Sequence, residues 1–124
     1  MDINDTWIWL CKSRDLLERG AAIAFDVAYA GRLMRAFAIR FEGQACAYLN
    51  ECTHVPMEMD WQPNQFWDHQ KRWLLCATHG AAYQPNTGQC VMGPCKRGLK
   101  KIDLKDDGEN VFWRTQYNLN PAEF

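Results

Sequence analysis

The sequence predicts an all-β fold, and two observations support this prediction. First, the apolar residues fall into short runs that are rich in branched and aromatic side chains, a composition that favours strands. Second, clusters of Gly, Pro, Asn and Asp separate these runs, as at residues 85–88 and 106–108. Short strands joined by tight turns pair as antiparallel neighbours. The chain has 124 residues, which is the size of one domain.

The N-terminal half predicts an antiparallel meander. Strands are expected at residues 7–11, 23–28, 33–41 and 45–49. In the third strand, alternate positions place apolar side chains on one face, which only Arg35 interrupts. Between the first two strands, residues 13–20 predict one helical turn, with Ser13 as its N-cap and Gly20 as its stop.

The C-terminal half predicts shorter elements and more loop. Strands are expected at residues 66–67, 72–75, 83–84, 89–91, 101–104 and 110–113, and the last two should form a hairpin. Aromatic side chains of the hairpin expected over residues 61–73 should pack in the core or form a docking rim: Trp61, Phe66, Trp67 and Trp73. Residues 115–124 predict a surface extension.

Composition and charge argue against several classes of protein. A general nucleic-acid binder is usually basic, whereas this chain has a net charge of −1. No apolar run approaches the roughly 20 residues of a membrane span. The N-terminus lacks the basic start and the longer apolar core of a signal peptide. A cytoplasmic protein is therefore expected.

The six cysteines are expected to be reduced, because disulfides are rare in proteins that are not exported. Cys11, Cys46 and Cys90 lie in apolar or strand-like stretches, so they predict small buried side chains. Cys95 has no predicted role. The remaining two cysteines each have a histidine close by in the sequence, which indicates a different chemistry.

Two short segments, Cys52-Thr53-His54 and Cys76-Ala77-Thr78-His79, each offer one thiolate and one imidazole. Structural zinc sites usually pair Cys with Cys and His with His, but each segment here mixes the two types. The mixture favours a two-iron cluster in which the cysteines bind one iron and the histidines bind the other. A zinc site and a Cys–His nucleophilic pair are the alternatives.

Together with Gly80 and the later Gly93-Pro94, these segments resemble the Rieske iron–sulfur family over residues 7–113. The resemblance implies an antiparallel β-sandwich base into which a smaller cluster-binding subdomain, residues 50–96, is inserted. Residues 1–124 would then be a single Rieske domain.

The same resemblance implies one [2Fe-2S] cluster and its ligands. Cys52 and Cys76 would bind the buried iron, and His54 and His79 would bind the outer iron near the surface.

Four further residues are implied to surround the cluster. Gly80 suits a tight backbone bend after the second histidine. Gly93 and Pro94 correspond to the third loop, which covers the cluster in this family, and Pro94 fixes its backbone. Tyr83 stands where high-potential members have a hydrogen-bond donor, and packing is its alternative role.

The chain departs from the family pattern in three ways, two of which separate it from the high-potential members. Those members have an extra cysteine in each ligand loop, but residues 55–57 and 77–78 contain none. They also place a donor serine where this chain has Ala81, so the reduced cluster should be less stabilised here. The expected potential lies in the lower half of the range from about −150 to +300 mV. Finally, residues 55–75 form a longer connection than is usual between the ligand pairs.

The remaining residues argue against catalysis within the chain. His69 is the one histidine outside the two segments, so the chain lacks the two histidines and one carboxylate that hold a mononuclear oxygenase iron. The sequence has no Gly-rich dinucleotide-binding motif. The protein is therefore expected not to be an enzyme.

The expected function is that of a soluble Rieske-type ferredoxin that carries single electrons between a reductase and a terminal oxidoreductase such as an oxygenase. A redox-sensing regulatory module and a small subunit of a larger reductase are the alternatives. Charged residues near the ligand segments are expected either to steer partners or to form a solvated face. They are Lys96, Arg97, Lys100, Lys101, Lys105, Glu51, Glu58 and Asp60.

Overall fold

The computed structural model describes residues 6–51, 58–60, 62–77, 80–93, 95 and 97–122. Within these ranges the named elements are β-strands and one 3-10 helix, η1 (Ser13–Asp15), and the strands of every sheet pair in the antiparallel sense. This confirms the all-β prediction. None of the described residues forms a helix that is long and apolar enough to cross a membrane.

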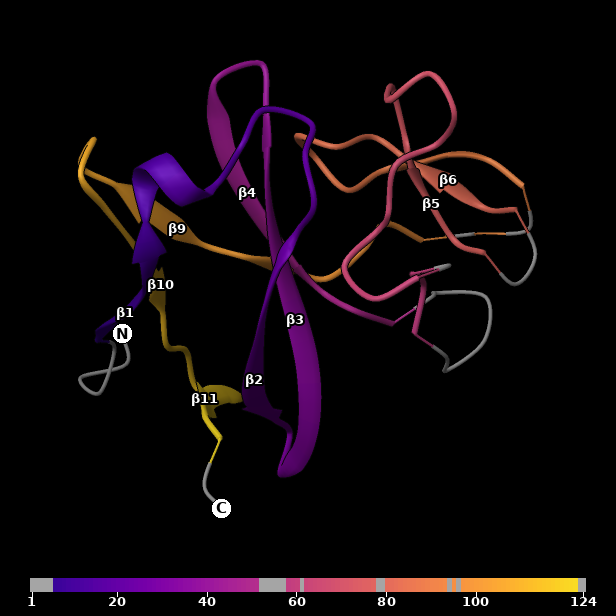
Figure 1. The fold of residues 1–124 in the computed structure, drawn as a ribbon. Helices are drawn as coiled ribbons and strands as arrows, with labels where there is room; N and C mark the ends of the chain where they lie inside the picture. Colours follow the sequence, from indigo (N-terminus) through magenta and orange to yellow (C-terminus); the bar gives the residue numbers. More distant parts are fainter. Residues whose placement is uncertain are drawn as a thin grey trace.

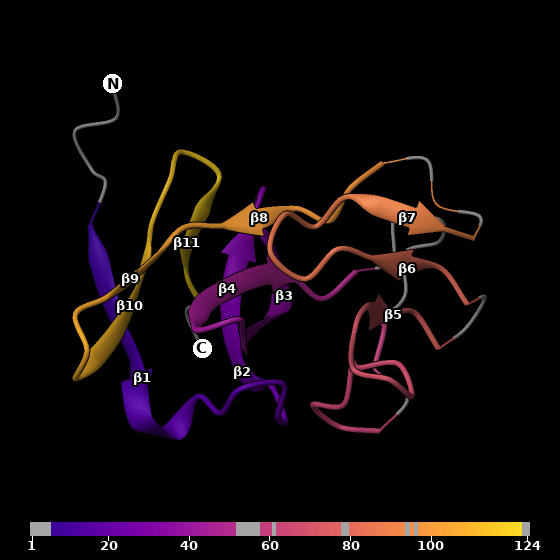
Figure 2. The same ribbon diagram turned by 90° about the horizontal axis from the view of Figure 1, so that it is seen from above.

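Three antiparallel sheets build the fold (Figures 1 and 2). The central sheet has the order β11 (Leu119–Pro121), β2 (Ile23–Tyr29), β3 (Arg32–Phe41), β4 (Gln44–Leu49), β8 (Lys101–Ile102). The second sheet has the order β1 (Trp7–Lys12), β10 (Asn110–Arg114), β9 (Leu104–Asp106). The third has the order β5 (Leu74–Leu75), β6 (Ala82–Tyr83), β7 (Cys90–Met92). Figure 2 shows the second and third sheets on opposite sides of the central sheet.

Strand β3 is buried on both faces because it lies between two hydrophobic cores. From its predicted apolar face, Phe37, Ile39 and Phe41 pack into one of them, here called the loop-side core. Leu33, predicted on the same face, is exposed instead. The other buried members of the loop-side core are Ala22, Cys46, Tyr48, Met59, Phe66, Trp67, Leu74, Cys76, Ala81, Tyr83 and Leu99. The opposite face of β3, through Ala36 and Ala38, packs into the base core. The loop-side core therefore connects the central sheet to the third sheet.

The long connection between the two Cys/His segments forms a hairpin. Trp67 pairs with Leu74, and the Leu75 amide donates to the Phe66 carbonyl at 2.7 Å. The ring of Phe66 stacks on Phe37 with centroids 3.8 Å apart, and the Trp67 indole N–H donates to the Gly20 carbonyl. Packing is thus the role of Phe66 and Trp67, as predicted. Trp61 lies outside the described residues.

The predicted helical turn over residues 13–20 is wrong in extent, because η1 ends at Asp15. The guanidinium of Arg40 donates to the Ser13 and Leu16 carbonyls at 3.1 and 2.7 Å. These carbonyls therefore have a partner on β3 and do not need a continuing helix. The contact ties the N-terminal segment to the central sheet.

The structure also differs from the expected surface extension at the C-terminus. Strand β11 pairs with β2 and covers the edge that β2 would otherwise expose. Leu119 is buried in the base core, and Thr115 is buried where its hydroxyl accepts a hydrogen bond from the Thr6 amide. The expected final hairpin is shifted as well, since β9 pairs with β10 while β8 pairs with β4.

Asp106 is expected to make stability depend on pH. Burial alone would raise the pKa of this carboxyl, but hydrogen bonds from the Gly108 amide, Ser13 and Arg40 outweigh burial and lower the pKa. Because the folded pKa is lowered, the stabilisation is present above the unfolded value of about 3.9 and is lost as the pH falls through the folded value. Asp106→Asn should lower the free energy of unfolding by about 1–2 kcal/mol at pH 7.

Urea denaturation followed by tryptophan fluorescence would measure this effect at pH 7 and at several acidic pH values. Asp103→Asn is the matched control, because Asp103 lies 3.9 Å from Arg114 and both side chains are more than 40% exposed. The gap between wild type and Asp106→Asn should close on acidification. A gap that stays constant with pH would contradict the prediction.

Candidate metal centre

The second Cys/His segment begins at the buried end of a tight hairpin between β5 and β6. Cys76 is 0% exposed, and its amide donates to the Ala81 carbonyl at 2.7 Å. The Gly80 amide donates back to the Cys76 carbonyl at 2.9 Å, and Gly80 has a φ of +74°, which suits glycine. The predicted bend at Gly80 is present. His79 lies outside the described residues.

The first segment, residues 52–54, lies in the stretch 52–57 that is outside the described residues, but the structure shows how the residues on either side of this stretch are held. Asn50 is buried, and its side-chain oxygen accepts a hydrogen bond from the Met59 amide at 2.7 Å. The side-chain amide of Asn50 donates to Asp60 at 3.0 Å. Asn50 therefore closes the loop that contains Cys52 and His54.

A backbone hydrogen bond links the second segment to Met59, which follows the first segment in the chain. The amide of Ala77, the residue after Cys76, donates to the Met59 carbonyl at 3.0 Å. Met59 and Cys76 are both fully buried in the loop-side core. The fold thus brings Met59, the second described residue after the stretch 52–57, against the start of the second segment. Sequence reasoning missed Asn50, although a polar residue directly after the apolar run of β4 is a signal that could have pointed to it.

Asn50→Ala is expected to destabilise the protein by about 1–3 kcal/mol, because the buried Met59 amide would lose its acceptor. Asn110→Ala is a matched control, since Asn110 accepts a hydrogen bond from the Trp9 indole at an exposed position. Its loss should cost less than about 1 kcal/mol. Equilibrium urea denaturation of both variants checks this, and equal losses would show that Asn50 has no special role.

The third loop makes a backbone contact with the second segment. Gly93 has a φ of +90°, and a Cβ added there would lie 2.7 Å from the Ala81 Cα and 3.1 Å from the Gly80 carbonyl oxygen. Only a glycine allows the two backbones to approach this closely. Gly80 and Gly93, which are predicted site residues, are therefore together in space. Pro94 lies outside the described residues.

Tyr83 is fully buried in the loop-side core, where it pairs with Leu74 on β5 and Cys90 on β7. Its predicted packing role is confirmed. Hydrogen-bond donation to a cluster remains a prediction. Ala81 is also fully buried, so a methyl group stands where the donor serine of high-potential members would be.

The cysteine predictions are partly right. Cys11 and Cys46 are buried, and burial raises the pKa of both thiols, which keeps them protonated and unreactive. The prediction of a reduced, buried Cys90 is wrong, because Cys90 forms a disulfide with Cys95 and is only half-buried. Cys95 lies five residues after Cys90, and the loop places their two Cα atoms 5.9 Å apart, within the range for a disulfide.

Several charged residues near the site make structural contacts. Asp60 accepts hydrogen bonds from Asn50 and the Asn64 amide, whereas Glu58 lies 3.9 Å from Arg35 at an exposed position. Lys100 lies over the Tyr29 ring at 5.4 Å. Steering of partners by these charges remains a prediction.

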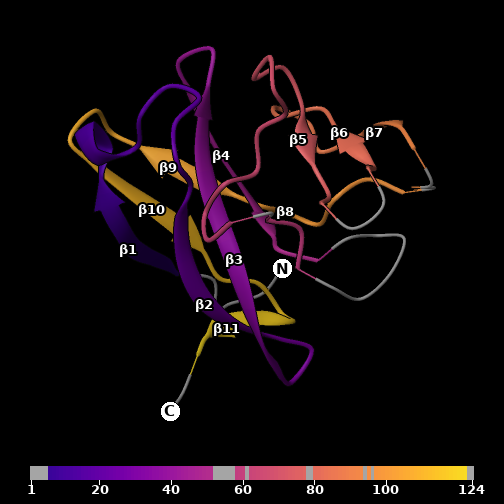
Figure 3. The same ribbon diagram turned by 45° about the vertical axis from the view of Figure 1, so that its right-hand side comes forward.

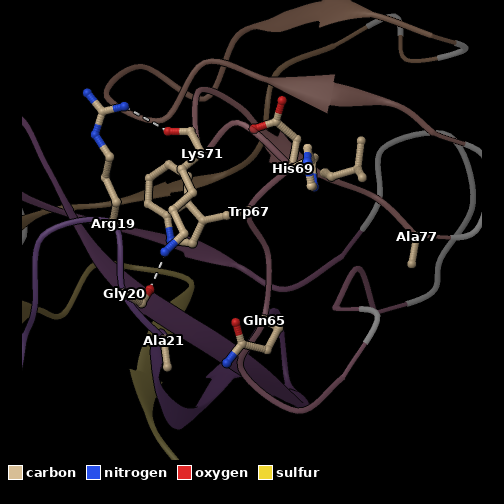
Figure 4. A pocket seen from close by; sticks show the side chains of 10 residues that line it. Arg19, Gly20, Ala21, Gln65, Trp67, His69, Lys71 and Ala77 are labelled. Carbon is tan, nitrogen blue, oxygen red and sulfur yellow. Dashed lines mark hydrogen bonds between the residues drawn. The ribbon is translucent and has the colours of Figure 1, made fainter.

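His69 lies at the edge of a pocket of about 720 Å³ beside the second segment (Figure 4). Arg19 and Trp67 line this pocket, and each is held by a hydrogen bond, to the Lys71 and Gly20 carbonyls respectively. Ala77 lines its other side. Among the residues that the structure describes, no three His, Cys, Asp or Glu side chains form a group that could hold a metal ion.

Comparisons with known proteins agree with this arrangement. The family model for the Rieske [2Fe-2S] domain matches residues 6–103. No curated protein sequence is a significant match.

Among solved structures, the ferredoxin of carbazole 1,9a-dioxygenase from Nocardioides aromaticivorans IC177 has a TM-score of 0.68 at 20% identity, and the match covers 94% of this chain and 99% of that one. The Sphingomonas yanoikuyae B1 ferredoxin has a TM-score of 0.63 at 18% identity, with 87% and 98% covered. The terminal oxygenase of the Nocardioides system has a TM-score of 0.68 at 18% identity, with 94% of this chain but 32% of that chain covered. These similarities show the fold.

Proposed function

Because this chain belongs to the Rieske [2Fe-2S] domain family, we propose that it is a ferredoxin-type electron carrier whose cluster is bound by Cys52, His54, Cys76 and His79. The hydrogen bond between the Ala77 amide and the Met59 carbonyl carries this proposal, because it ties the segment that supplies Cys76 and His79 to Met59, which follows the segment of Cys52 and His54 in the chain. Two thiolates and two imidazoles are the ligand set of a Rieske centre.

The described residues fit such a cluster. Cys76 has no solvent exposure, as suits a ligand of the inner iron, and Tyr83 and Leu74 are buried in the same core. The backbone of Gly93 in the third loop lies against the backbone of Gly80 and Ala81, directly after the second segment. When bound, the cluster would accept and release one electron, while the protein holds the ligands in place and limits solvent access.

The partners that fit this role are a reductase as electron donor and a terminal oxygenase or reductase as acceptor. Support comes from the Nocardioides ferredoxin of similar fold, which is a component of carbazole 1,9a-dioxygenase and matches this chain over nearly its whole length. A cytoplasmic location suits such a carrier and remains a prediction.

The proposal is tested by one-electron transfer in solution. A flavin-dependent ferredoxin reductase with NADH is the donor, and cytochrome c is the acceptor. Purified protein should raise the rate of cytochrome c reduction in proportion to its concentration and should show the EPR signal of a reduced [2Fe-2S] centre. A protein that binds iron but gives no concentration-dependent transfer would oppose a carrier role. Co-purification with a large partner would favour a subunit of a reductase.

The reduction potential is expected in the lower half of the range from about −150 to +300 mV. Ala81 offers no hydroxyl to stabilise the reduced cluster, so reduction is harder than in high-potential members. Ala81→Ser should raise the reduction potential, because it adds the missing hydroxyl at a fully buried position beside Gly93. Protein-film voltammetry of both proteins measures this. A wild-type value near the upper end would contradict the assignment.

A further inference from the structure

We propose that Cys90 and Cys95 form a second redox site, a thiol–disulfide couple that exchanges with dithiols and whose oxidised form holds the third loop against the second Cys/His segment. This site goes beyond the proposed electron carriage, because its substrate is a dithiol and its electrons move in pairs. Four features of the structure support it.

The first feature is position. Cys90 begins β7 and pairs with Tyr83 of β6, while Cys95 follows Gly93 across the third loop. Both sulfur atoms pack against the loop-side core but the two residues are only half-buried. The disulfide therefore lies at the edge of the third sheet, where a dithiol can reach it. Figure 2 shows β7 on the side of β6 opposite to β5, and Figure 3 shows these three strands together on one side of the central sheet.

The second feature is that both oxidation states are accommodated. The Sγ atom of Cys90 lies 2.9 Å from the Cys95 carbonyl oxygen, and the Sγ atom of Cys95 lies 3.3 Å from the Met92 carbonyl oxygen. After reduction, each new thiol has a carbonyl acceptor already in reach. These acceptors would favour reversible interconversion of the two states.

The third feature links the couple to the proposed cluster site. Gly93 lies between the two cysteines, and its backbone contacts Ala81 and Gly80. Beyond Cys95, the chain is held again where the Leu99 amide donates to the Gly88 carbonyl at 2.8 Å. The disulfide thus restrains the part of the loop between these anchors. When the disulfide is reduced, the backbone contact of Gly93 with Ala81 and Gly80 is less restrained.

The fourth feature is selectivity among the cysteines. Cys11 and Cys46 are buried, and burial raises the pKa of their thiols, so neither is suited to exchange. Of these four cysteines, only the Cys90–Cys95 pair is therefore suited to thiol–disulfide exchange. Disulfides of proteins in reducing compartments are usually transient or redox-sensing, which is the behaviour proposed here.

The exchange is balanced. A dithiolate sulfur attacks one sulfur of the Cys90–Cys95 bond, a mixed disulfide forms, and the second thiol of the reductant resolves it. The protein gains two electrons and two protons and ends with two thiols. The dithiol loses the same number and ends as a cyclic disulfide.

The test uses the holoprotein equilibrated in buffers with graded ratios of reduced to oxidised dithiothreitol. Denaturation with an alkylating agent and peptide mapping then report the state of residues 90 and 95. Alkylation of the two residues should rise together. The ratio of reduced to oxidised protein should change tenfold for each tenfold change in the ratio of reduced to oxidised dithiothreitol. Full alkylation in every buffer, or none in any, would overturn the proposal.

Hydrogen exchange tests the mechanical link. Reduction should speed exchange at the amides of Gly80 and Ala81 on the order of tenfold, because the Gly93 contact is released. A Cys90→Ser/Cys95→Ser variant should exchange at the fast rate in both oxidising and reducing buffers, and Cys46→Ser should respond as wild type does. Unchanged exchange on reduction would refute the clamp. Neither assay depends on electron transfer through the cluster, so its outcome is separate from that of the proposed function.

Discussion

Cys76→Ala is expected to abolish cluster binding, whereas Cys46→Ala is expected to leave the cluster in place. Both residues are buried in the loop-side core, and both substitutions remove one sulfur atom, so their effects on packing are matched. Cys76 lies at the hydrogen-bonded end of the second Cys/His segment, whereas Cys46 lies within β4. A missing thiolate leaves one iron without half of its protein ligands.

Iron content and visible absorption of the two purified variants measure this difference. Iron should fall from about two per chain to near zero in Cys76→Ala and should stay near two in Cys46→Ala. Unfolding by urea, measured on both, separates ligand loss from global destabilisation. Retention of iron in Cys76→Ala, or loss of iron in both variants, would count against the assigned ligand.

Gly93→Ala is expected to be the most damaging single methyl addition, with a loss of about 3 kcal/mol in the free energy of unfolding. A non-glycine residue with this positive φ costs about 1–2 kcal/mol. The remainder comes from the added Cβ, which would lie 2.7 Å from the Ala81 Cα. That neighbour is backbone, so relief requires the third loop to move away from the second segment. Iron retention should fall as well.

Gly108→Ala is the matched control, because Gly108 has a φ of +93° and no atom lies within 4 Å of an added Cβ. It carries the conformational cost without the clash, so a loss of about 1–2 kcal/mol and normal iron content are expected. Urea denaturation and iron analysis of both variants decide the point. Equal losses would mean that the contact between Gly93 and Ala81 contributes nothing.

Much of the fold follows from local sequence patterns. The predicted strands at residues 7–11 and 23–28 match β1 and β2 to within one residue, because a run of branched and aromatic side chains bounded by turn residues is a local property. The buried Phe66 and Trp67 follow for the same reason, since large aromatic side chains in a short run favour a core. The ligand types and their spacing are also visible in the sequence.

Other features depend on segments that are far apart in the chain. Strand β11 forms because the exposed edge of β2 accepts it, and residues 115–121 contain no strong strand signal. The helical turn after Ser13 is cut short by Arg40, which comes from β3. Both outcomes depend on long-range contacts that compete with local preferences.

From the sequence come the chemical groups of this protein: two Cys/His segments, an alanine where a hydrogen-bond donor could stand, and glycines at positions of positive φ. The tertiary structure decides how these groups meet. The side chain of Asn50 accepts a hydrogen bond from the Met59 amide, the Met59 carbonyl accepts one from the Ala77 amide, and Cys90 forms a disulfide with Cys95. The reason is physical: side-chain chemistry belongs to each residue, whereas the approach of distant backbones is set by packing around the loop-side core.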